Sequence, residues 1–472
     1  MRMYDEENPQ DVNEAAEGGV NALMLATSTN SLSTVEALIA LNADVNAATT
    51  DCKTTALMVA CMSDYSDVAE ALISANADVN AVDKESFSPL MLAAAMGADR
   101  TIALLLRSDP PANQKWVQYD KSAKVGQNQS GRTALHWASA MGFLEACRLL
   151  VADPPTNEEK AVILRWKEKK RAATPLALAA NQGHTDVVAL LSEASLRVDD
   201  KDSLPLVEEP LDKKNANRTA LHLAAQSGHP SCVRSLVIDA RAKVDAKDSK
   251  GYSSLMLAAA MGEADVVRVL VQLGSTVDLP MENKLEEKEK EWADGTTALM
   301  LACACGHTSA VTVLLEARAD VDARDRGKGK TSLHLACERG QHAVLRALLQ
   351  AGAITDETDD DGRAALHAAC DAGDLEACKA LLPALKKGAA FNEPTSKGET
   401  PLMLAVKKKA PVELIKLLIG ANADLDMEGP FWGLHAGVTP LTVAREGYGD
   451  ADGYDGADIE KILATPRAAM LQ

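Results

Sequence analysis

The fold is decided by one short phrase, Thr219-Ala220-Leu221-His222-Leu223-Ala224, and by the Gly228-His229 pair that follows it. The phrase returns with small changes along the whole chain, from Asn21-Ala22-Leu23-Met24-Leu25-Ala26 to Thr439-Pro440-Leu441-Thr442-Val443-Ala444. A phrase that recurs in this way is typical of a repeat architecture. The sequence therefore predicts one small structural unit, present in about a dozen copies.

The leucine of the phrase measures the length of each unit. Successive leucines, from Leu23 to Leu441, lie 34, 33, 45, 41, 45, 34, 44, 34, 33, 36 and 39 residues apart. The shortest intervals are 33 or 34 residues, and the others exceed them by varying amounts. A fixed minimum with occasional additions indicates one unit that carries loop insertions.

Each unit has the pattern of two short helices. The opening Thr or Ser suits a helix N-cap, and the Pro or Ala after it suits the first turn. After the glycine comes a second apolar run, such as Val187, Val188, Leu190 and Leu191, which forms one stripe on a helix. The unit ends in an Asx-rich turn such as Ala43-Asp44-Val45-Asn46-Ala47. Two short helices cannot bury their apolar faces alone, so neighbouring units must stack.

These units resemble ankyrin repeats. The resemblance rests on the phrase, the Gly-His break, the Leu-Leu pair and the Asp-Val-Asn-Ala end, and it covers about residues 19–445. It implies an all-α solenoid of stacked helix-turn-helix units, with short β-hairpin fingers along one edge and a concave palm lined by the first helices. The family's histidine commonly makes a buried hydrogen bond within its turn. Units with methionine instead are therefore expected to rely more on apolar packing; they contain Met24, Met58, Met91, Met256, Met300 and Met403.

The two ends and four of the fingers depart from the plain repeat. We expect an acidic tail over residues 1–18 and a capping segment over residues 446–472, in which Ile459 and Leu463 belong to a closing helix. Insertions enlarge the fingers near residues 107–131, 152–172, 195–217 and 278–294. The first two insertions continue into stretches of high β propensity, 116–119 and 162–166, and the fourth has a charged stretch of helical character, 282–294.

Aromatic residues are rare, at 3% of the chain, and most tryptophans lie in the insertions. Aromatic side chains on projecting loops are typical of binding surfaces. The alternative is that each ring folds back and fastens its own insertion to the repeats. The candidate partner-binding residues are Trp116, Tyr119, Trp166, Trp292, Phe431 and Trp432.

Charge and composition exclude several classes of function. The net charge is −19, and residues 1–106 alone hold 16 acidic and 4 basic residues, so nucleic acid is not expected as the main ligand. No apolar run is long enough for a membrane span. The start of the chain lacks a secretory signal, and nine cysteines without paired spacing fit a reducing compartment, so we expect a cytoplasmic protein. The basic run 167–171 is a weak nuclear address or a solvated face.

Three motifs resemble phosphate-binding or metal-binding sites, but the residues around each motif argue against such a site. The segment 327–332 lacks the first glycine of a phosphate loop, and Thr331 opens a repeat. Cys303, Cys305, Cys370 and Cys378 are expected to be buried small hydrophobes rather than metal ligands. The run 357–362 lacks the final glutamate of a calcium loop.

The remaining residues give no catalytic group. The phrase histidines His136, His222, His334 and His367 lie a repeat apart and cannot converge. No cofactor or metal is expected, and the chain is not expected to be an enzyme. The resemblance makes Asn46 and Asn80 candidates for asparagine hydroxylation, because they occupy the hairpin position modified in some ankyrin-like proteins. Two functions fit: an interaction scaffold or structural subunit of a larger assembly, and a regulatory or substrate-recruiting adaptor for an enzyme on another chain.

Overall fold

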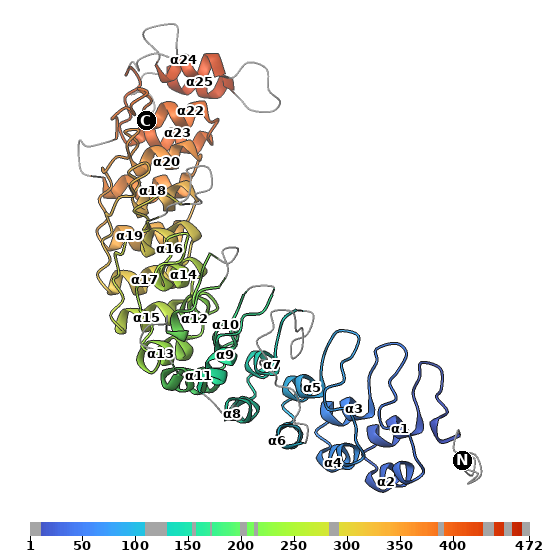
Figure 1. Cartoon of the computed structure of the whole chain (residues 1–472). Coiled ribbons are helices and arrows are strands. Elements are labelled where there is room, and N and C mark those ends of the chain that lie inside the picture. Colours follow the sequence, from blue (N-terminus) through green and yellow to red (C-terminus); the bar gives the residue numbers. More distant parts are fainter. Residues whose placement is uncertain are drawn as a thin grey trace. The chain divides into compact units, whose positions relative to one another are not determined.

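The computed structural model describes residues 11–108, 130–152, 157–169, 172–198, 205–211, 216–282, 292–385, 391–427, 439–447 and 456–464. The chain divides into two compact units, Met1–Val244 (unit 1) and Asp245–Gln472 (unit 2). Each unit is a series of short helix pairs (Figure 1), as the repeated phrase predicts. The all-α fold class is therefore confirmed.

The described part of unit 1 contains six helix pairs and one extra helix. The first helices of the pairs are α1 (Ala22–Ser28), α3 (Ala56–Met62), α5 (Pro89–Met96), α7 (Ala134–Met141), α10 (Pro175–Gln182) and α12 (Ala220–Gln226). The second helices are α2 (Leu32–Ala40), α4 (Ser66–Ser74), α6 (Asp99–Arg107), α8 (Leu144–Ala152), α11 (Thr185–Val198) and α13 (Pro230–Ile238). The described part of this unit also holds α9 (Asn157–Arg165) and the 3-10 turns η1 (Asp11–Asn13) and η2 (Leu206–Glu208).

Six further pairs lie among the residues of unit 2 that the structure describes. The first helices are α14 (Ser254–Met261), α16 (Ala298–Cys305), α18 (Ser332–Glu338), α20 (Ala365–Asp371), α22 (Pro401–Lys407) and α24 (Pro440–Gly447). The second helices are α15 (Ala264–Gln272), α17 (Thr308–Glu316), α19 (His342–Gln350), α21 (Leu375–Leu381), α23 (Val412–Gly420) and α25 (Gly456–Ala464), with a 3-10 turn η5 (Leu382–Ala384) after α21. The closing helix predicted around Ile459 is α25, whose Ile459 and Leu463 are buried.

The first helices begin and end where the sequence predicts. In α5, the hydroxyl of Ser88 accepts a hydrogen bond from the backbone N–H of Met91, and Pro89 occupies the first turn. A proline there costs no hydrogen bond, because that N–H has no partner inside the helix. The helix ends at Gly97, whose φ of +69° is a left-handed conformation that favours glycine.

Stacking within each unit explains the alanine-rich composition. In unit 1 the first helices pack side by side in one row and the second helices in another (Figure 1). The buried side of α5 consists of Leu90, Met91, Ala93 and Ala94. Small alanines let neighbouring helices approach closely, while leucines fill the remaining space. The core is therefore a thin layer that continues from repeat to repeat within a unit.

The fingers are turns closed by single contacts. Isolated antiparallel bridges join Ala48 to Thr55 in unit 1 and Thr358 to Ala364 in unit 2, and no strand forms among the described residues. Only a few residues separate each turn from the next helix, so there is room for one bridge. Aspartate shapes the turn, as the Asx-rich sequence predicts: Asp83 Oδ1 accepts hydrogen bonds from the N–H groups of Glu85 (2.9 Å) and Phe87 (2.7 Å).

One expectation about the insertions is wrong. The stretch Val162–Trp166 was expected to be extended, but Asn157–Arg165 forms helix α9. A short apolar run does not distinguish strand from helix, and burial decides here, because Ile163 and Leu164 are both fully covered where α9 packs against α11. The third insertion begins as an extension of α11, which reaches Val198. The stretches 116–119 and 283–291 lie outside the described residues.

Candidate protein-binding surfaces

The histidine of the phrase joins one repeat to the next. Nδ1 of His136 accepts a hydrogen bond from the backbone N–H of Thr133 (3.2 Å), so the proton is on Nε2, which donates to the carbonyl of Ala173 (3.2 Å) in the following finger. His334 makes the same pair of contacts, and its Nε2 lies 2.8 Å from the carbonyl oxygen of Arg363. These rings fix the distance between neighbouring fingers.

Burial keeps these histidines neutral. It lowers the pKa of His136 to about 4, and it lowers the pKa of His367 to about 4. Burial also lowers the pKa of His334. Each ring, including that of His222, accepts the N-cap N–H of its own first helix. A structural role explains all four, as their spacing in the sequence indicates.

Methionine at this position makes one of the two contacts that histidine makes. The sulfur of Met58 accepts the N–H of Thr55 at 3.5 Å, and the sulfur of Met300 accepts the N–H of Thr297 at 3.4 Å. A thioether has no proton to donate, so it cannot form the second contact with the next finger. Met58 and Met300 are fully buried, in agreement with the greater reliance on apolar packing expected for these repeats.

The asparagines at the finger turns also link repeats. Asn46 Oδ1 accepts a hydrogen bond from the N–H of Asp78 (2.7 Å), and its Nδ2 donates to the carbonyl of Asn76 (3.2 Å). The backbone N–H of Asn80 donates to Asp78 Oδ1 (2.9 Å). Both the oxygen and the nitrogen of the Asn46 side-chain amide thus form hydrogen bonds with the next repeat. These two bonds give Asn46 a structural role. Hydroxylation of Asn46 or Asn80 stays a prediction.

One side of each first helix does not face the core, and we call the row of these sides within a unit the palm. In α5 it consists of Leu92, Ala95 and Met96, spaced three and four residues apart. The same three positions hold Leu25, Ser28 and Thr29 in α1, Val59, Met62 and Ser63 in α3, and Trp137, Ala140 and Met141 in α7. Three of these apolar side chains are well exposed: Leu25 at 57%, Met96 at 55% and Met141 at 49%.

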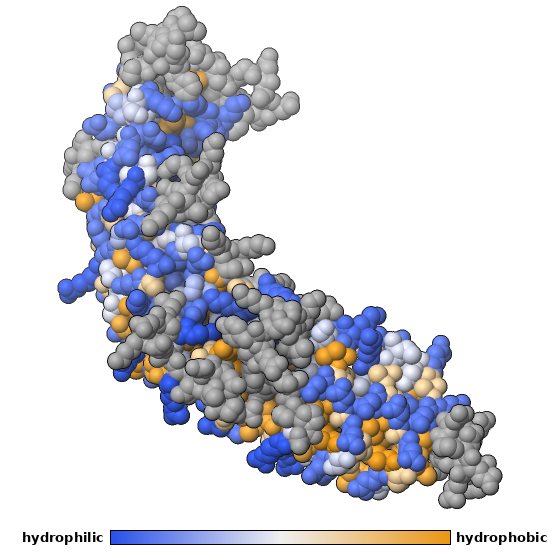
Figure 2. Space-filling model, viewed as in Figure 1, coloured by the Kyte–Doolittle hydropathy of each residue, from blue (hydrophilic) through white to orange (hydrophobic). Residues whose placement is uncertain are grey.

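Most palm residues of α1 to α7 are apolar, and the palm of unit 1 is more polar after them. Figure 2 shows hydrophobic residues gathered over the part of unit 1 that holds α1 to α4. The outward positions are Leu178, Asn181 and Gln182 in α10, and Leu223, Gln226 and Ser227 in α12. The hydroxyl of Ser227 donates to the Asn181 side chain (3.3 Å). The apolar surface therefore runs from α1 to α7.

The palm of unit 2 is covered and charged. The residues that correspond to Leu25 are buried, for example Leu335 at 8% exposure. In α18 and α20 the outward positions hold Glu338 and Asp371, which form ion pairs: Glu338 lies 2.5 Å from Lys330 Nζ, and Asp371 lies 3.1 Å from Arg363. The main apolar exception is Met261, at 48% exposure. The two units thus present different chemistry on the same face of the repeat.

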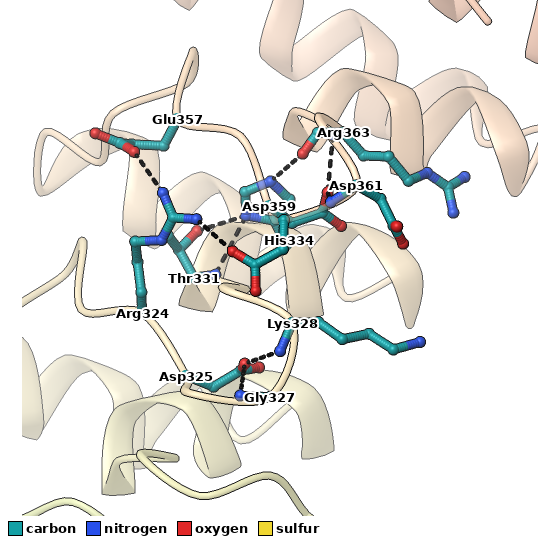
Figure 3. A network of polar contacts seen from close by, with 11 residues as sticks. Arg324, Asp325, Gly327, Lys328, Thr331, His334, Glu357, Asp359, Asp361 and Arg363 are labelled. Atoms are coloured by element: carbon teal, nitrogen blue, oxygen red, sulfur yellow. Dashed lines mark hydrogen bonds and ion pairs between the residues drawn. The ribbon is translucent and has the colours of Figure 1, made fainter. Parts of the chain in front are cut away.

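The phosphate-loop-like segment is a finger of unit 2 (Figure 3). Asp325 Oδ1 accepts hydrogen bonds from the N–H groups of Gly327 (3.0 Å) and Lys328 (2.7 Å). These are the donors that a phosphate would need. Thr331 caps α18 together with His334. The segment is therefore an Asx turn, in line with the sequence context.

The calcium-loop-like run is also a turn. Asp359 Oδ1 accepts the N–H groups of Asp361 (3.0 Å) and Arg363 (2.8 Å), while Glu357 lies 3.4 Å from Arg324 (Figure 3). These carboxylates do not converge on one point. Within the described ranges, no cluster of three or more His, Cys, Asp or Glu side chains is placed to hold a metal ion.

Three of the four cysteines predicted to be buried are buried, and one is exposed. Cys303, Cys370 and Cys378 are buried as expected, and burial raises the pKa of Cys303 to about 12, which makes its thiol unreactive. Cys305 is exposed instead. It occupies the last position of α16, one turn after Leu301, and therefore lies on the palm side of the helix.

Two of the predicted aromatic contacts lie against the repeats. The indole Nε1 of Trp166 donates to the carbonyl of Gly131 (3.2 Å), and the ring is half-buried. Trp292 packs against Met300 and Leu335, with the Arg339 guanidinium 5.8 Å from its ring centroid. This arrangement agrees with the alternative that the rings fasten their own insertions. Trp116, Tyr119, Phe431 and Trp432 lie outside the described residues, and contact with a partner stays a prediction for all six.

The apolar palm of unit 1 was not among the binding sites predicted from the sequence. A signal was present, because Met96, Met141 and Met261 each directly precede the glycine that ends a first helix. An apolar residue at that position faces away from the second helix. Whether the neighbouring residue one turn earlier is exposed could be learned only from the packing.

A family model described as ankyrin repeats (3 copies) matches the chain in overlapping stretches at residues 5–83, 23–117, 77–161, 155–248, 200–283, 279–359 and 352–429. In the part of the chain that the structure describes, no helix combines the length and apolar content needed to cross a bilayer.

Similar proteins share only a part of their length with this chain. A putative E3 ubiquitin-protein ligase of Arabidopsis thaliana is 29% identical over 188 residues, 38% of this chain and 35% of that protein. The ankyrin repeat and KH domain-containing protein mask-1 of Caenorhabditis elegans is 30% identical over 157 residues, 33% of this chain and 5% of that protein. The ankyrin repeat and SAM domain-containing protein 6 of Danio rerio is 27% identical over 189 residues, 40% of this chain and 22% of that protein.

Proposed function

Because the chain belongs to the ankyrin repeat family, we propose that it is a non-catalytic scaffold for protein–protein interaction, or a structural subunit of a larger assembly. The observation that carries the proposal is the exposed apolar palm of α1 to α7, since a monomeric surface rarely leaves such side chains in water without a binding role. The concave palm and the enlarged fingers are the proposed contact surfaces. Nucleic acid is not a proposed ligand.

The absence of enzymatic activity is part of the proposal. The segments that imitate phosphate and calcium sites have their donors and acceptors engaged in turns. All four phrase histidines are buried, and burial lowers the pKa of His136, His334 and His367. A site for catalysis needs polar groups that converge on a substrate, and these groups instead support the backbone.

Photo-cross-linking tests the proposal in the native cell extract. A photoreactive amino acid replaces Ser63 at the palm end of α3, Glu85 on a finger, or Glu70 on the outer side of α4; all three side chains are exposed. We expect discrete protein adducts from Ser63 or Glu85 and none from Glu70. Adducts from Glu70 alone, or from no position, would reject binding through the palm and fingers of unit 1.

A regulatory or substrate-recruiting adaptor is the second candidate. Two of the similar proteins, from Arabidopsis thaliana and Oryza sativa, are named as putative or probable E3 ubiquitin-protein ligases. This chain aligns with 35% and 27% of their lengths. In this second proposal the enzyme is on another chain. Cross-linked partners present at stable, equal stoichiometry support the scaffold, whereas an enzyme bound transiently together with its substrate supports the adaptor.

We also propose a cytoplasmic location and leave hydroxylation open to test. The sulfurs of Cys370 and Cys378 are 3.8 Å apart without a bond, which fits a reducing compartment. The basic run proposed as a nuclear address is partly engaged, since Lys167 Nζ lies 2.8 Å from the carbonyl of Pro210. Microscopy of the tagged chain checks the location, and intact-mass measurement of native material checks whether Asn46 or Asn80 carries an added oxygen.

A further inference from the structure

The apolar palm of unit 1 differs from the palm of unit 2 at equivalent positions. The residue one turn before the end of the first helix is exposed or half-exposed in the first four repeats, as at Leu25 and Leu92. In α14 to α22 of unit 2 it is buried, as at Leu301 and Leu335. The repeat fold itself therefore does not require this exposure. An apolar strip that is specific to α1–α7 points to a ligand that covers it.

The charge around this strip restricts the ligand. Residues 11–108 and 130–152, which include α1 to α8, hold 14 acidic and 6 basic side chains, a net charge of −8. Exposed acidic residues stand on successive fingers beside the first helices, at Glu17, Asp51 and Glu85. Six cations cannot neutralise fourteen carboxylates, so the field over this surface is negative. It attracts a basic ligand and repels an acidic one.

The geometry of the row restricts the ligand further. Neighbouring packed helices lie about 8–10 Å apart, and seven residues of an α-helix rise about 10 Å. A ligand helix lying along the row would therefore present an apolar side chain to each successive palm helix at every seventh residue. Four palm helices span about 30 Å, which corresponds to a helix of about 20 residues.

A helix fits this surface better than an extended segment. An extended chain needs hydrogen-bond partners for its own N–H and carbonyl groups, and the helices of the palm have already paired theirs. A helix satisfies its backbone internally and offers only side chains. Met62, Met96 and Met141 can adjust to different apolar partners, because the methionine side chain is unbranched and flexible.

We propose that the palm of α1–α7 binds an amphipathic, basic helix of about 20 residues from a partner protein. The apolar stripe of that helix covers Leu25, Met96 and Met141, and its lysine or arginine residues face the acidic fingers. This inference rests on the proposed function and specifies the partner of the same surface. It excludes acidic helices and unpatterned basic chains as ligands.

Three labelled 20-residue peptides test the proposal with the full chain, by fluorescence anisotropy. The first is a leucine–lysine helix with one apolar stripe, the second has the same composition with the stripe scrambled, and the third is a leucine–glutamate helix with the stripe. We expect the first peptide to bind at least about tenfold more tightly than either of the others, with an affinity that falls as salt rises.

Variants locate the binding site. The double variant Met96→Ser/Met141→Ser should weaken binding of the leucine–lysine helix by at least about tenfold. Met261→Ser is the matched control, because Met261 has similar exposure at the same position of a unit 2 helix, and it should change binding less than about twofold. Circular dichroism checks that each variant keeps its helices. Equal loss from Met261→Ser would overturn the assignment of the site.

The outcomes separate this inference from the proposed function. If the scrambled or acidic peptide binds as tightly as the basic helix, the partner assignment is wrong. Photo-cross-linking from Ser63 or Glu85 would still support protein binding in that case. If the peptides discriminate as expected but no cellular adduct forms, the surface has the inferred preference and the scaffold function is wrong.

Discussion

The histidine of the phrase connects repeats because its ring has two nitrogens that point in different directions. Nδ1 holds its own helix start, and Nε2 holds the next finger, as His136 does with Thr133 and Ala173. Methionine replaces only the first contact, as at Met58. The sequence alone places these residues correctly, since caps and turns depend on nearby positions. It does not reveal which carbonyl the second nitrogen reaches.

The pKa of His136 gives a prediction for His136→Met. At pH 7.5 the variant should lose about 1 kcal/mol, the net value of one hydrogen bond. The pKa is about 4 in the folded protein and about 6.5 in an unfolded chain. The neutral ring therefore contributes its stability fully above about pH 6.5, and this contribution is lost as the pH falls toward 4. The deficit of the variant should shrink or reverse at pH 5.

Urea midpoints of the natural chain and His136→Met at pH 7.5 and pH 5 measure this difference. His334 and His367 remain in both proteins, so their titration cancels in the comparison. Met256→Leu is the control; it alters a buried side chain that does not titrate, and its effect should be the same at both pH values. An equal deficit for His136→Met at both pH values would contradict the assigned pKa.

At the scale of elements, helix pairs are predictable and insertions are not. The pairs follow from local patterns of caps, stripes and glycines. Helix α9 and the residues after it instead make contacts that are distant in sequence. Arg165, at the end of α9, lies 2.6 Å from Glu209, and the buried Glu168, three residues later, pairs with Arg132 at 2.5 Å. The exposure of the palm also depends on contacts that the local pattern does not predict. Leu25 and Leu335 occupy equivalent positions, but Leu25 is exposed, whereas Leu335 is buried and packs against Trp292.

Helix α9 should behave as a part of the repeat core. Ile163 and Leu164 are both fully buried, so Ile163→Ala and Leu164→Ala should each cost about 2–5 kcal/mol. Lys160→Ala, at a half-buried position of the same helix, should cost less than about 0.5 kcal/mol. Urea denaturation of the three variants gives the comparison. Costs near zero for the two apolar variants would mean that α9 is a detachable insertion.

At the scale of the whole molecule, charge excludes one large class of ligands. The net charge of −19 repels phosphate backbones. In unit 2, some of the described basic side chains already have carboxylate partners: Arg324 pairs with Asp360 (3.2 Å), and Lys330 pairs with Glu338 (2.5 Å). A nucleic acid would have to compete with these contacts and overcome the long-range field. The same field favours the basic helix inferred as the partner of unit 1.

The full chain should therefore bind the positively charged leucine–lysine helix and not the negatively charged nucleic acids. At about 0.15 M salt, labelled duplex DNA and single-stranded RNA should show no binding tighter than about 100 μM, the weak end of non-specific association. The leucine–lysine helix should bind under the same conditions. Lowering the salt lengthens the range of repulsion and should not produce nucleic-acid binding. If either nucleic acid binds below about 1 μM, its phosphates must reach a local cluster of cations, and net charge no longer predicts which partners this chain accepts.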